Sequence, residues 1–209
     1  MKKALFFIVI IIALFISACN NAAKTSHDDH AAHEATTPAA EESMSAGNSG
    51  EAQVIKASFT DVDAKASTHI DNVFAHYFHV KNALVAANTA DAKSGADAIA
   101  KEIKGFDKSL LTMQQKEAYD ARIATIQKAA TDIAASDQLA EQRASFETLS
   151  NNIYELAKAF GGSQTLYQEY CPMAFDNKGA LWLSESKEIR NPYFGDEMLT
   201  CGKVREIIE

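Results

Sequence analysis

The chain has 209 residues, of which 47% are hydrophobic, and a formal net charge of −8 at pH 7. An acidic chain of this kind is not expected to bind nucleic acid or an anionic membrane surface as its main partner. The sequence contains no glycine-rich phosphate loop, serine elbow or zinc-protease helix motif. We therefore predict that the protein is not an enzyme and has no small-molecule substrate.

The N-terminal segment, residues 1–18, has the pattern of a bacterial lipoprotein signal peptide. Lys2 and Lys3 precede an apolar run over residues 4–16, and small residues lead into Cys19. A membrane-spanning anchor is the alternative, but these 13 apolar residues are fewer than the ~20 that a helix needs to cross a bilayer. We expect Cys19 to carry a palmitate-type lipid anchor, which places the mature protein in the cell envelope, facing the periplasm or the exterior.

Residues 19–56 are predicted to form a disordered linker after the lipidated cysteine. The stretch is rich in Ala, Thr, Ser, Glu and Gly, and it has too few large apolar residues to offset the entropy of ordering. Within it, "HDDHAAHE" spaces His27, His30 and His33 by three residues. Such a tract is typical of loose, auxiliary capture of zinc, copper or nickel, although a solvated polar tether would have the same composition.

Residues 57–209 are predicted to form one mainly α-helical domain, an antiparallel four-helix bundle with a small irregular or β-hairpin C-terminal lobe. Short breaks at residues 88–89, 105–112 and 136–137 separate four helical segments, and glycines at 161–162 end the last one. The apolar positions that recur at three- and four-residue steps are Ile70, Val73, Phe74, Tyr77, Val80 and Leu84; Ile99, Ile103 and Phe106; Tyr119, Ile123, Ile126, Ala130 and Ile133; and Phe146, Leu149, Ile153, Leu156 and Phe160. We also expect Met113 and Trp182 to be core residues.

Two histidines of the first helical segment are candidate metal ligands. His76 and His79 are three residues apart, a spacing at which two helical side chains can converge on one ion. The alternative is that both are boundary residues, half covered and hydrogen bonded, because the sequence specifies no third ligand nearby.

The C-terminal block, residues 170–202, brings together the chemistry that the helices lack. Cys171 and Met173 are two apart in a segment that Pro172 keeps extended, so they point to one face. Met198 and Cys201 are three apart on a short helical turn, which also aligns them. Thiolate and thioether sulfur suit copper(I) best, with zinc or another soft or borderline metal as an alternative.

A disulfide between Cys171 and Cys201 is the competing interpretation of this block. Disulfides persist outside the cytoplasm, and a bridge closing about 30 residues would stabilise the fold by roughly 3 kcal/mol. The two cysteines are too far apart in sequence for a Cys-x-x-Cys redox motif. The lobe would then be a stapled protein-interaction module without metal.

Several strings of this chain resemble one known family. They are "HYFHVKNALVAAN" at residues 76–88, "YCPMAFDNKGALWLS" at 170–184, "EIRNPYFGDEML" at 188–199, and "CG" at 201–202. Over about residues 65–205 the chain is similar to the domain of unknown function 3347, which occurs in bacterial periplasmic lipoproteins and at the end of adaptor subunits of heavy-metal efflux systems.

The resemblance implies metal handling by the family's association with efflux adaptors, since the family has no established activity. Together with the soft ligands, it leads us to expect a lipid-anchored copper(I) chaperone or scavenger that serves a heavy-metal efflux adaptor. The predicted metal ligands are Cys171, Met173, Met198 and Cys201, with His76 and His79 as possible additional ligands. The alternative is the disulfide-stapled module, partnering an efflux or envelope complex.

Overall fold

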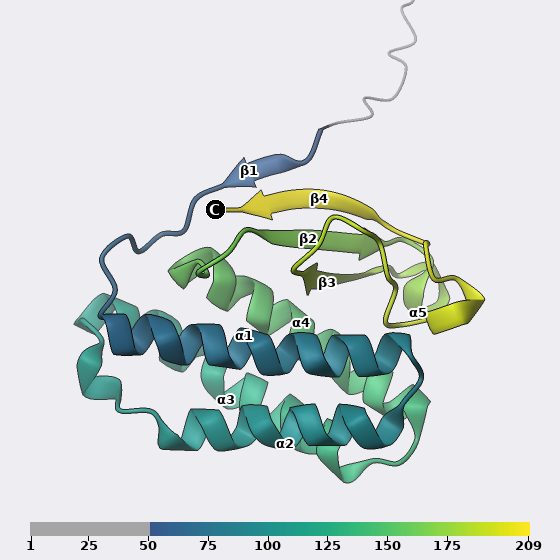
Figure 1. The fold of residues 1–209 in the computed structure, drawn as a ribbon, viewed down its shortest axis with the longest axis horizontal. Helices are drawn as coiled ribbons and strands as arrows, with labels where there is room; N and C mark the ends of the chain where they lie inside the picture. Colours follow the sequence, from purple (N-terminus) through teal and green to yellow (C-terminus); the bar gives the residue numbers. More distant parts are fainter. Residues whose placement is uncertain (1–50) are drawn as a thin grey trace, which may run out of the picture. The chain divides into compact units, whose positions relative to one another are not determined.

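The structure, a computed structural model, describes residues 51–209, which form four long helices and a small mixed β-sheet (Figure 1). The long helices are α1 (Ala64–Val85), α2 (Thr89–Gly105), α3 (Met113–Ala135) and α4 (Leu139–Phe160). Successive helices pack against one another, and α1 also packs against α4. The prediction of a mainly helical fold with a small C-terminal lobe is therefore confirmed.

Several predictions concern residues outside the described part of the chain. These are the signal peptide over residues 1–18, the lipidated Cys19, and the tract of His27, His30 and His33. Most of the predicted linker also lies there, but its C-terminal end does not. The linker was predicted to reach residue 56, and this end point is wrong because Gln53–Ile55 form strand β1.

The helices begin and end where local signals place them. Asp63 caps α1 by accepting a hydrogen bond from the Lys65 amide at 2.8 Å. Thr112 and Gln115 form a capping box at the start of α3. Gly161, with φ +69°, ends α4 in a conformation that favours glycine. The three predicted breaks between helices are all observed.

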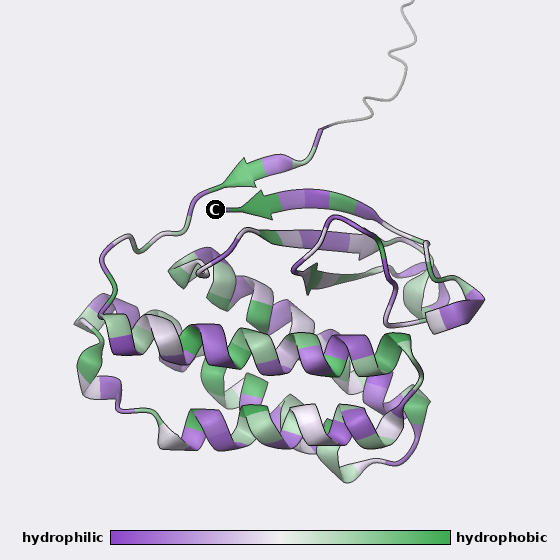
Figure 2. Cartoon of the chain, viewed as in Figure 1, coloured by the Kyte–Doolittle hydropathy of each residue, from purple (hydrophilic) through white to green (hydrophobic). Residues whose placement is uncertain are grey.

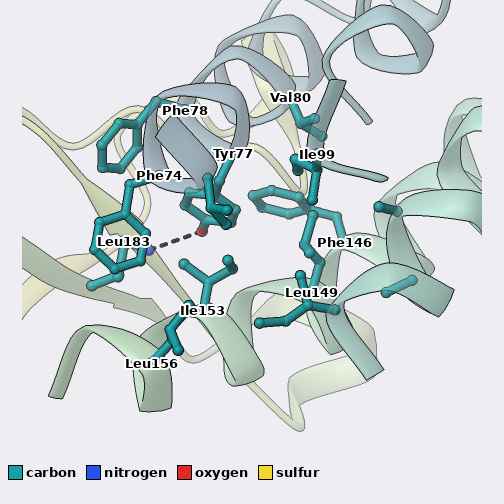
Figure 3. Packing of buried hydrophobic residues seen from close by; sticks show 14 of the residues in the cluster. Phe74, Tyr77, Phe78, Val80, Ile99, Phe146, Leu149, Ile153, Leu156 and Leu183 are labelled. Atoms are coloured by element: carbon teal, nitrogen blue, oxygen red, sulfur yellow. Dashed lines mark hydrogen bonds between the residues drawn. The ribbon is translucent and has the colours of Figure 1, made fainter. Parts of the chain in front are cut away.

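The core lies between the helices and beneath one face of the sheet. Apolar positions line the inward faces of the helices, while polar residues occupy the outward ones (Figure 2). Tyr77 stacks on Phe146 with ring centroids 5.3 Å apart, and Ile153 and Leu183 pack around this pair (Figure 3). The residues of the predicted apolar stripes are buried, except Phe106, which is partly exposed but still packs against the core.

Met113 does not belong to this core, so that prediction is wrong. Its side chain is 81% exposed, whereas Trp182 is fully buried as expected. Met113 is the first residue of α3, six positions before the inward-facing Tyr119. At 100° per residue this offset points the two side chains about 120° apart.

The sheet has four strands in the order β1-β4-β2-β3. Its strands are β1 (Gln53–Ile55), β2 (Leu166–Cys171), β3 (Ala180–Ser184) and β4 (Lys203–Ile208). The antiparallel hairpin of β2 and β3 confirms the predicted hairpin, and β4 pairs antiparallel with β2. Strand β1 pairs in parallel with β4, about 150 residues later in the chain, and local sequence carries no signal for such a distant partner.

Short helical turns connect the strands of the lobe. They are α5 (Ala174–Asn177) and the 3₁₀ turn η2 (Gly195–Glu197); a further 3₁₀ turn, η1 (Lys108–Leu110), joins α2 to α3. Helix α4 fixes the lobe to the helices through Arg143, whose Nε donates to the Pro192 carbonyl at 2.9 Å and whose Nη2 donates to the Leu84 carbonyl at 3.3 Å. The loop before β4 is thus anchored on two helices.

Candidate thiol and metal centre

The structure brings the two C-terminal cysteines into contact. Cys171 is the last residue of β2 and Cys201 lies just before β4, and their sulfur atoms are 2.6 Å apart. Both are free thiols; Cys171 is fully buried and Cys201 is partly exposed. Burial, and then the neighbouring Cys171, raise the pKa of the Cys201 thiol to about 11, against a hydrogen bond from the Met173 amide that lowers it.

A strained turn follows Cys171. Phe175, Asp176 and Asn177 have φ values of 51°, 56° and 67°, so three consecutive non-glycine residues are left-handed. Each such residue costs about 1–2 kcal/mol relative to the right-handed conformation. Met173 lies just before this turn, and its side chain is 48% exposed at the surface of the lobe. Strain of this kind is often found at functional sites.

The segment before Cys201 is organised by one buried side chain. Asn191 is fully buried, and its Oδ1 accepts hydrogen bonds from the amides of Tyr193 at 2.8 Å and Phe194 at 3.3 Å. Its Nδ2 donates to the carbonyl of Cys201 at 2.8 Å. Met198 is partly buried in this segment, and its carbonyl accepts from the Cys201 amide at 3.0 Å.

A buried carboxyl group lies on the strand that carries Cys171. Glu169 is two residues earlier, on the same face of β2, and neither of its carboxyl oxygens has a hydrogen-bond partner. The indole nitrogen of Trp182 is near this carboxyl, but it too is without a partner of good geometry. Burial raises the pKa of Glu169 to about 8, despite the opposing charge of Lys81. The carboxyl is therefore mostly protonated at neutral pH.

Lys81 links this region to the end of β3. Its side chain is 3% exposed, and its Nζ donates to Glu185 Oε2 at 2.8 Å and to Ser184 Oγ at 3.3 Å. The face of α1 that carries Tyr77 and Lys81 therefore packs on the sheet.

The candidate histidines lie on another side of α1, where they face α2. His79 Nε2 is 2.8 Å from Asp91 Oδ1, and His76 lines a hollow of about 620 Å³ together with Lys101 and Glu102. Tyr77 and Lys81 face the sheet, and His76 and His79 are one and two positions away from them on the helix, so these histidines point in other directions. The structure therefore does not bring His76 or His79 to the cysteine pair.

A third histidine of α1 is buried against the same hollow. His69 Nδ1 lies 3.0 Å from Glu102 Oε1, His69 Nε2 lies 2.8 Å from the Tyr119 hydroxyl, and the ring stacks on Phe106 with centroids 3.9 Å apart. Burial lowers the pKa of His69 despite the neighbouring carboxylate. Because both ring nitrogens are occupied, this histidine has no free atom for a ligand.

Among residues 51–209, no cluster of three or more His, Cys, Asp or Glu side chains is arranged to hold a metal ion. Likewise, none of the helices in this range is both long and apolar enough to span a membrane. Any metal bound at the cysteine pair would need ligands of another kind, such as methionine sulfur.

Most of the helical part of the chain matches one known protein family. Residues 73–165 match the family described as "Protein of unknown function (DUF3347)". The match runs from α1 to the residue before β2, so the predicted family is confirmed over a shorter range than residues 65–205, and the strings around Cys171 and Cys201 lie beyond the DUF3347 match. Searches of curated proteins and of solved structures found no match to the chain.

Sequence reasoning missed two residues of this centre. Asn191 precedes Pro192, a pair that by sequence alone indicates only a turn, although a buried asparagine often organises a loop. Glu169 follows Gln168 in the strand, and a glutamate is ordinarily expected at an exposed position. A register shift between Gln168 and Glu169 turns Glu169 inward instead. No local signal distinguishes such a bulge from a regular strand.

Proposed function

We propose that this protein is a lipid-anchored, copper(I)-binding protein of the bacterial cell envelope that acts as a chaperone or scavenger. The observation that supports this proposal best is the meeting of Cys171 and Cys201, whose sulfur atoms are 2.6 Å apart although the residues are 30 positions apart in sequence. Two thiolates form a soft ligand pair that suits copper(I) better than calcium or magnesium. Zinc is the alternative metal.

Binding requires a small opening of the pair. A metal ion bonded to both sulfurs at about 2.3 Å, the zinc–thiolate distance, needs them further apart than 2.6 Å in most geometries. Cys201 is the natural residue to move, because it is partly exposed and lies in a loop, whereas Cys171 is buried within a paired strand. Met173 and Met198 are then the thioether ligands that complete the site, and Met173 is exposed enough to meet an incoming ion.

The rest of the chain would support delivery of the metal. The four long helices, which we propose form an antiparallel bundle, provide a rigid base for the lobe. Cys19 anchors the protein to the membrane by its lipid, and His27, His30 and His33 collect metal ions loosely. The partner that receives the ion is, in this proposal, a heavy-metal efflux adaptor. His76 and His79 are left out of the site because they face α2.

A disulfide-stapled interaction module is the second candidate function. It is favoured by the complete burial of Cys171 and by a sulfur contact that is already shorter than a metal bridge requires. In this case the bridge would hold β4 and the preceding loop onto β2. The lobe would then present its surface to an envelope protein without any metal.

A copper(I) titration against a chromophoric chelator, without oxygen, tests the first proposal. The full chain is used with Cys19→Ser and with His27, His30 and His33 replaced by Ala, so that only the C-terminal pair can bind. We expect one copper(I) ion per reduced chain, and no tight binding when Cys171→Ser and Cys201→Ser are added. Equal binding by both chains would overturn the proposal.

Two methionines offer a matched test of the thioether ligands. Met173→Leu should weaken copper(I) binding about tenfold, the effect of removing one soft ligand. Met113→Leu changes a methionine on α3 that is even more exposed, at 81% against 48% for Met173, and should leave the affinity unchanged. If both variants behave like the parent chain, Met173 is not a ligand.

The oxidation state in the cell separates the two candidate functions. Cells are quenched in acid, free thiols are alkylated after the chain has been denatured, and the isolated chain is analysed by mass spectrometry. Alkylated Cys171 and Cys201 agree with a metal site. A bridged pair, combined with no copper binding by the reduced chain, would leave the stapled module as the better account.

A further inference from the structure

We propose that Asn191 is a positioning residue that holds Cys201 in reach of Cys171. This inference rests on the proposed function only in taking the cysteine pair as the working site, and it applies whether the pair binds metal or forms a disulfide. The side-chain hydrogen bonds of Asn191 go to backbone groups and not to either sulfur. It acts through the backbone of Cys201.

Cys171 is held in place without help from Asn191. Cys171 pairs with Ala180 at the end of the β2–β3 hairpin, and β2 also pairs with β4. The side chain of Cys171 is fully buried. Its position is therefore set by strand pairing and core packing.

Cys201, in contrast, lies in a connection that has no strand partner. The strand β4 begins two residues later, at Lys203, and the turn η2 ends four residues earlier, at Glu197. Between them, the amide of Cys201 donates only to the Met198 carbonyl, a local bond within the same turn. The carbonyl of Cys201 accepts from Asn191 Nδ2 at 2.8 Å. That bond ties Cys201 to a residue ten positions earlier.

Asn191 itself is fixed to the rest of the protein. Its backbone amide donates to the Leu199 carbonyl at 2.8 Å, and its own carbonyl accepts from the Gly195 amide at 2.9 Å. Next to it, the Pro192 carbonyl is held by Arg143 of α4, and the Tyr193 hydroxyl donates to the Leu181 carbonyl of β3 at 2.6 Å. Asn191 therefore joins an anchored point of the lobe to Cys201, the member of the pair that lies in a loop.

By holding Cys201 in place, the bond from Asn191 raises the effective concentration of one thiol at the other. A thiol held at bonding distance reacts with its partner far more readily than one that samples a loop, and each lost buried hydrogen bond changes such an equilibrium by about tenfold. Removing the bond to the Cys201 carbonyl should therefore weaken the pair specifically. A loss of stability elsewhere in the fold should not weaken the contact between the two thiols.

Two variants of Asn191 remove this bond in different ways. Asn191→Ser is neutral and keeps an oxygen that can accept from the following amides, but it is too short to reach the Cys201 carbonyl. Asn191→Asp keeps the shape and both accepted bonds while losing the donor. Either variant alone tests the inference if the other does not fold. Leu149→Ala, in the α4 core, is the control for lost stability.

The test is the equilibrium between the Cys171–Cys201 pair and glutathione at pH 7, using the full chain with Cys19→Ser. Two protein thiols and one glutathione disulfide exchange to give one protein disulfide and two glutathione molecules, so the reaction is balanced. We expect Asn191→Ser and Asn191→Asp to lower the equilibrium constant for protein disulfide formation about tenfold. Leu149→Ala should lower the melting temperature and leave that constant within about twofold.

The inference is overturned if the Asn191 variants keep the parent constant, or if Leu149→Ala lowers it equally. Failure of the proposed function has a different signature. In that case the reduced parent chain binds no copper(I), while its glutathione equilibrium still reports on Asn191.

Discussion

The hydroxyl of Tyr77 on α1 accepts a hydrogen bond from the backbone amide of Leu183 on β3, with an oxygen–nitrogen distance of 3.0 Å (Figure 3). Strand β3 is an edge of the sheet, so this amide has no neighbouring strand to pair with on that side. The same hydroxyl is 2.9 Å from Ser150 Oγ on α4. One side chain thus joins two helices to the sheet that carries Cys171.

Replacing Tyr77 should therefore be costly. We expect Tyr77→Phe to lower the free energy of unfolding by about 1–3 kcal/mol, because it leaves a buried amide and a buried hydroxyl without partners. Urea unfolding followed by circular dichroism measures the loss. Tyr170→Phe is the matched control, since the Tyr170 hydroxyl makes only a 3.4 Å contact at the surface. Equal losses in the two variants would contradict this role of Tyr77.

The buried Glu169 predicts how stability depends on pH. Its pKa is about 8 in the folded chain, against 4.5 for an ordinary glutamate. The folded chain therefore holds this proton more tightly than the unfolded chain, and stability falls as the pH rises from about 4.5 to 8.

Glu169→Gln removes the titrating group and should flatten that decline. Between pH 5 and pH 8, we expect the wild-type chain to lose up to about 4 kcal/mol more unfolding free energy than the variant does. Denaturant unfolding at several pH values provides the measurement. Glu188→Gln, at a side chain that is 73% exposed, should keep the wild-type dependence. A variant Glu169→Gln with an unchanged pH slope would show that the carboxyl is ionised in the folded protein.

The raised pKa of Cys201 predicts slow alkylation. With a pKa of about 11, only a very small fraction of this thiol is ionised near neutral pH. We expect iodoacetamide to modify Cys201 in the reduced, folded chain about 100-fold more slowly than in the unfolded chain, since the thiolate is the reacting form. Mass spectrometry of the Cys201 peptide over a range of pH gives the apparent pKa.

Cys171→Ser should lower that apparent pKa and speed the reaction of Cys201. The neighbouring thiol is one of the two main causes of the shift, and serine does not ionise in this range. The urea-unfolded variant serves as the control, because there both chains should react at the same rate. An apparent pKa that does not change in Cys171→Ser would mean that burial alone governs the thiol.

Gly179 allows the hairpin between β2 and β3 to close. Its φ is +79°, and a Cβ atom there would lie 1.9 Å from the hydroxyl oxygen of Tyr170. We expect Gly179→Ala to lower the unfolding free energy by at least about 1 kcal/mol through strain and displacement of this ring. Gly105→Ala, where no atom lies within 4 Å of the added Cβ, should not destabilise the fold. Thermal unfolding of both variants distinguishes these outcomes.

The four long helices and their core could be predicted from the sequence because the signals are local. Repeats such as Tyr119, Ile123 and Ile126 follow the helical period, and breaks such as Gly161 act within one turn. The hairpin of β2 and β3 is local in the same sense. Met113 shows the limit, because a single apolar residue at a helix start does not reveal which way it points.

The thiol centre depends on contacts that no local pattern specifies. Cys171 and Cys201 were paired by chemical type alone, and only the sheet order β1-β4-β2-β3 brings their sulfurs together. His76 and His79 have a suitable spacing but face α2, because the direction of a helix face is set by its packing partner. The inward turn of Glu169 comes from a strand irregularity, and the bond from Asn191 to Cys201 comes from loop closure. In each case the stabilising contact joins residues that are not neighbours in the sequence, so the arrangement is set only when the whole domain folds.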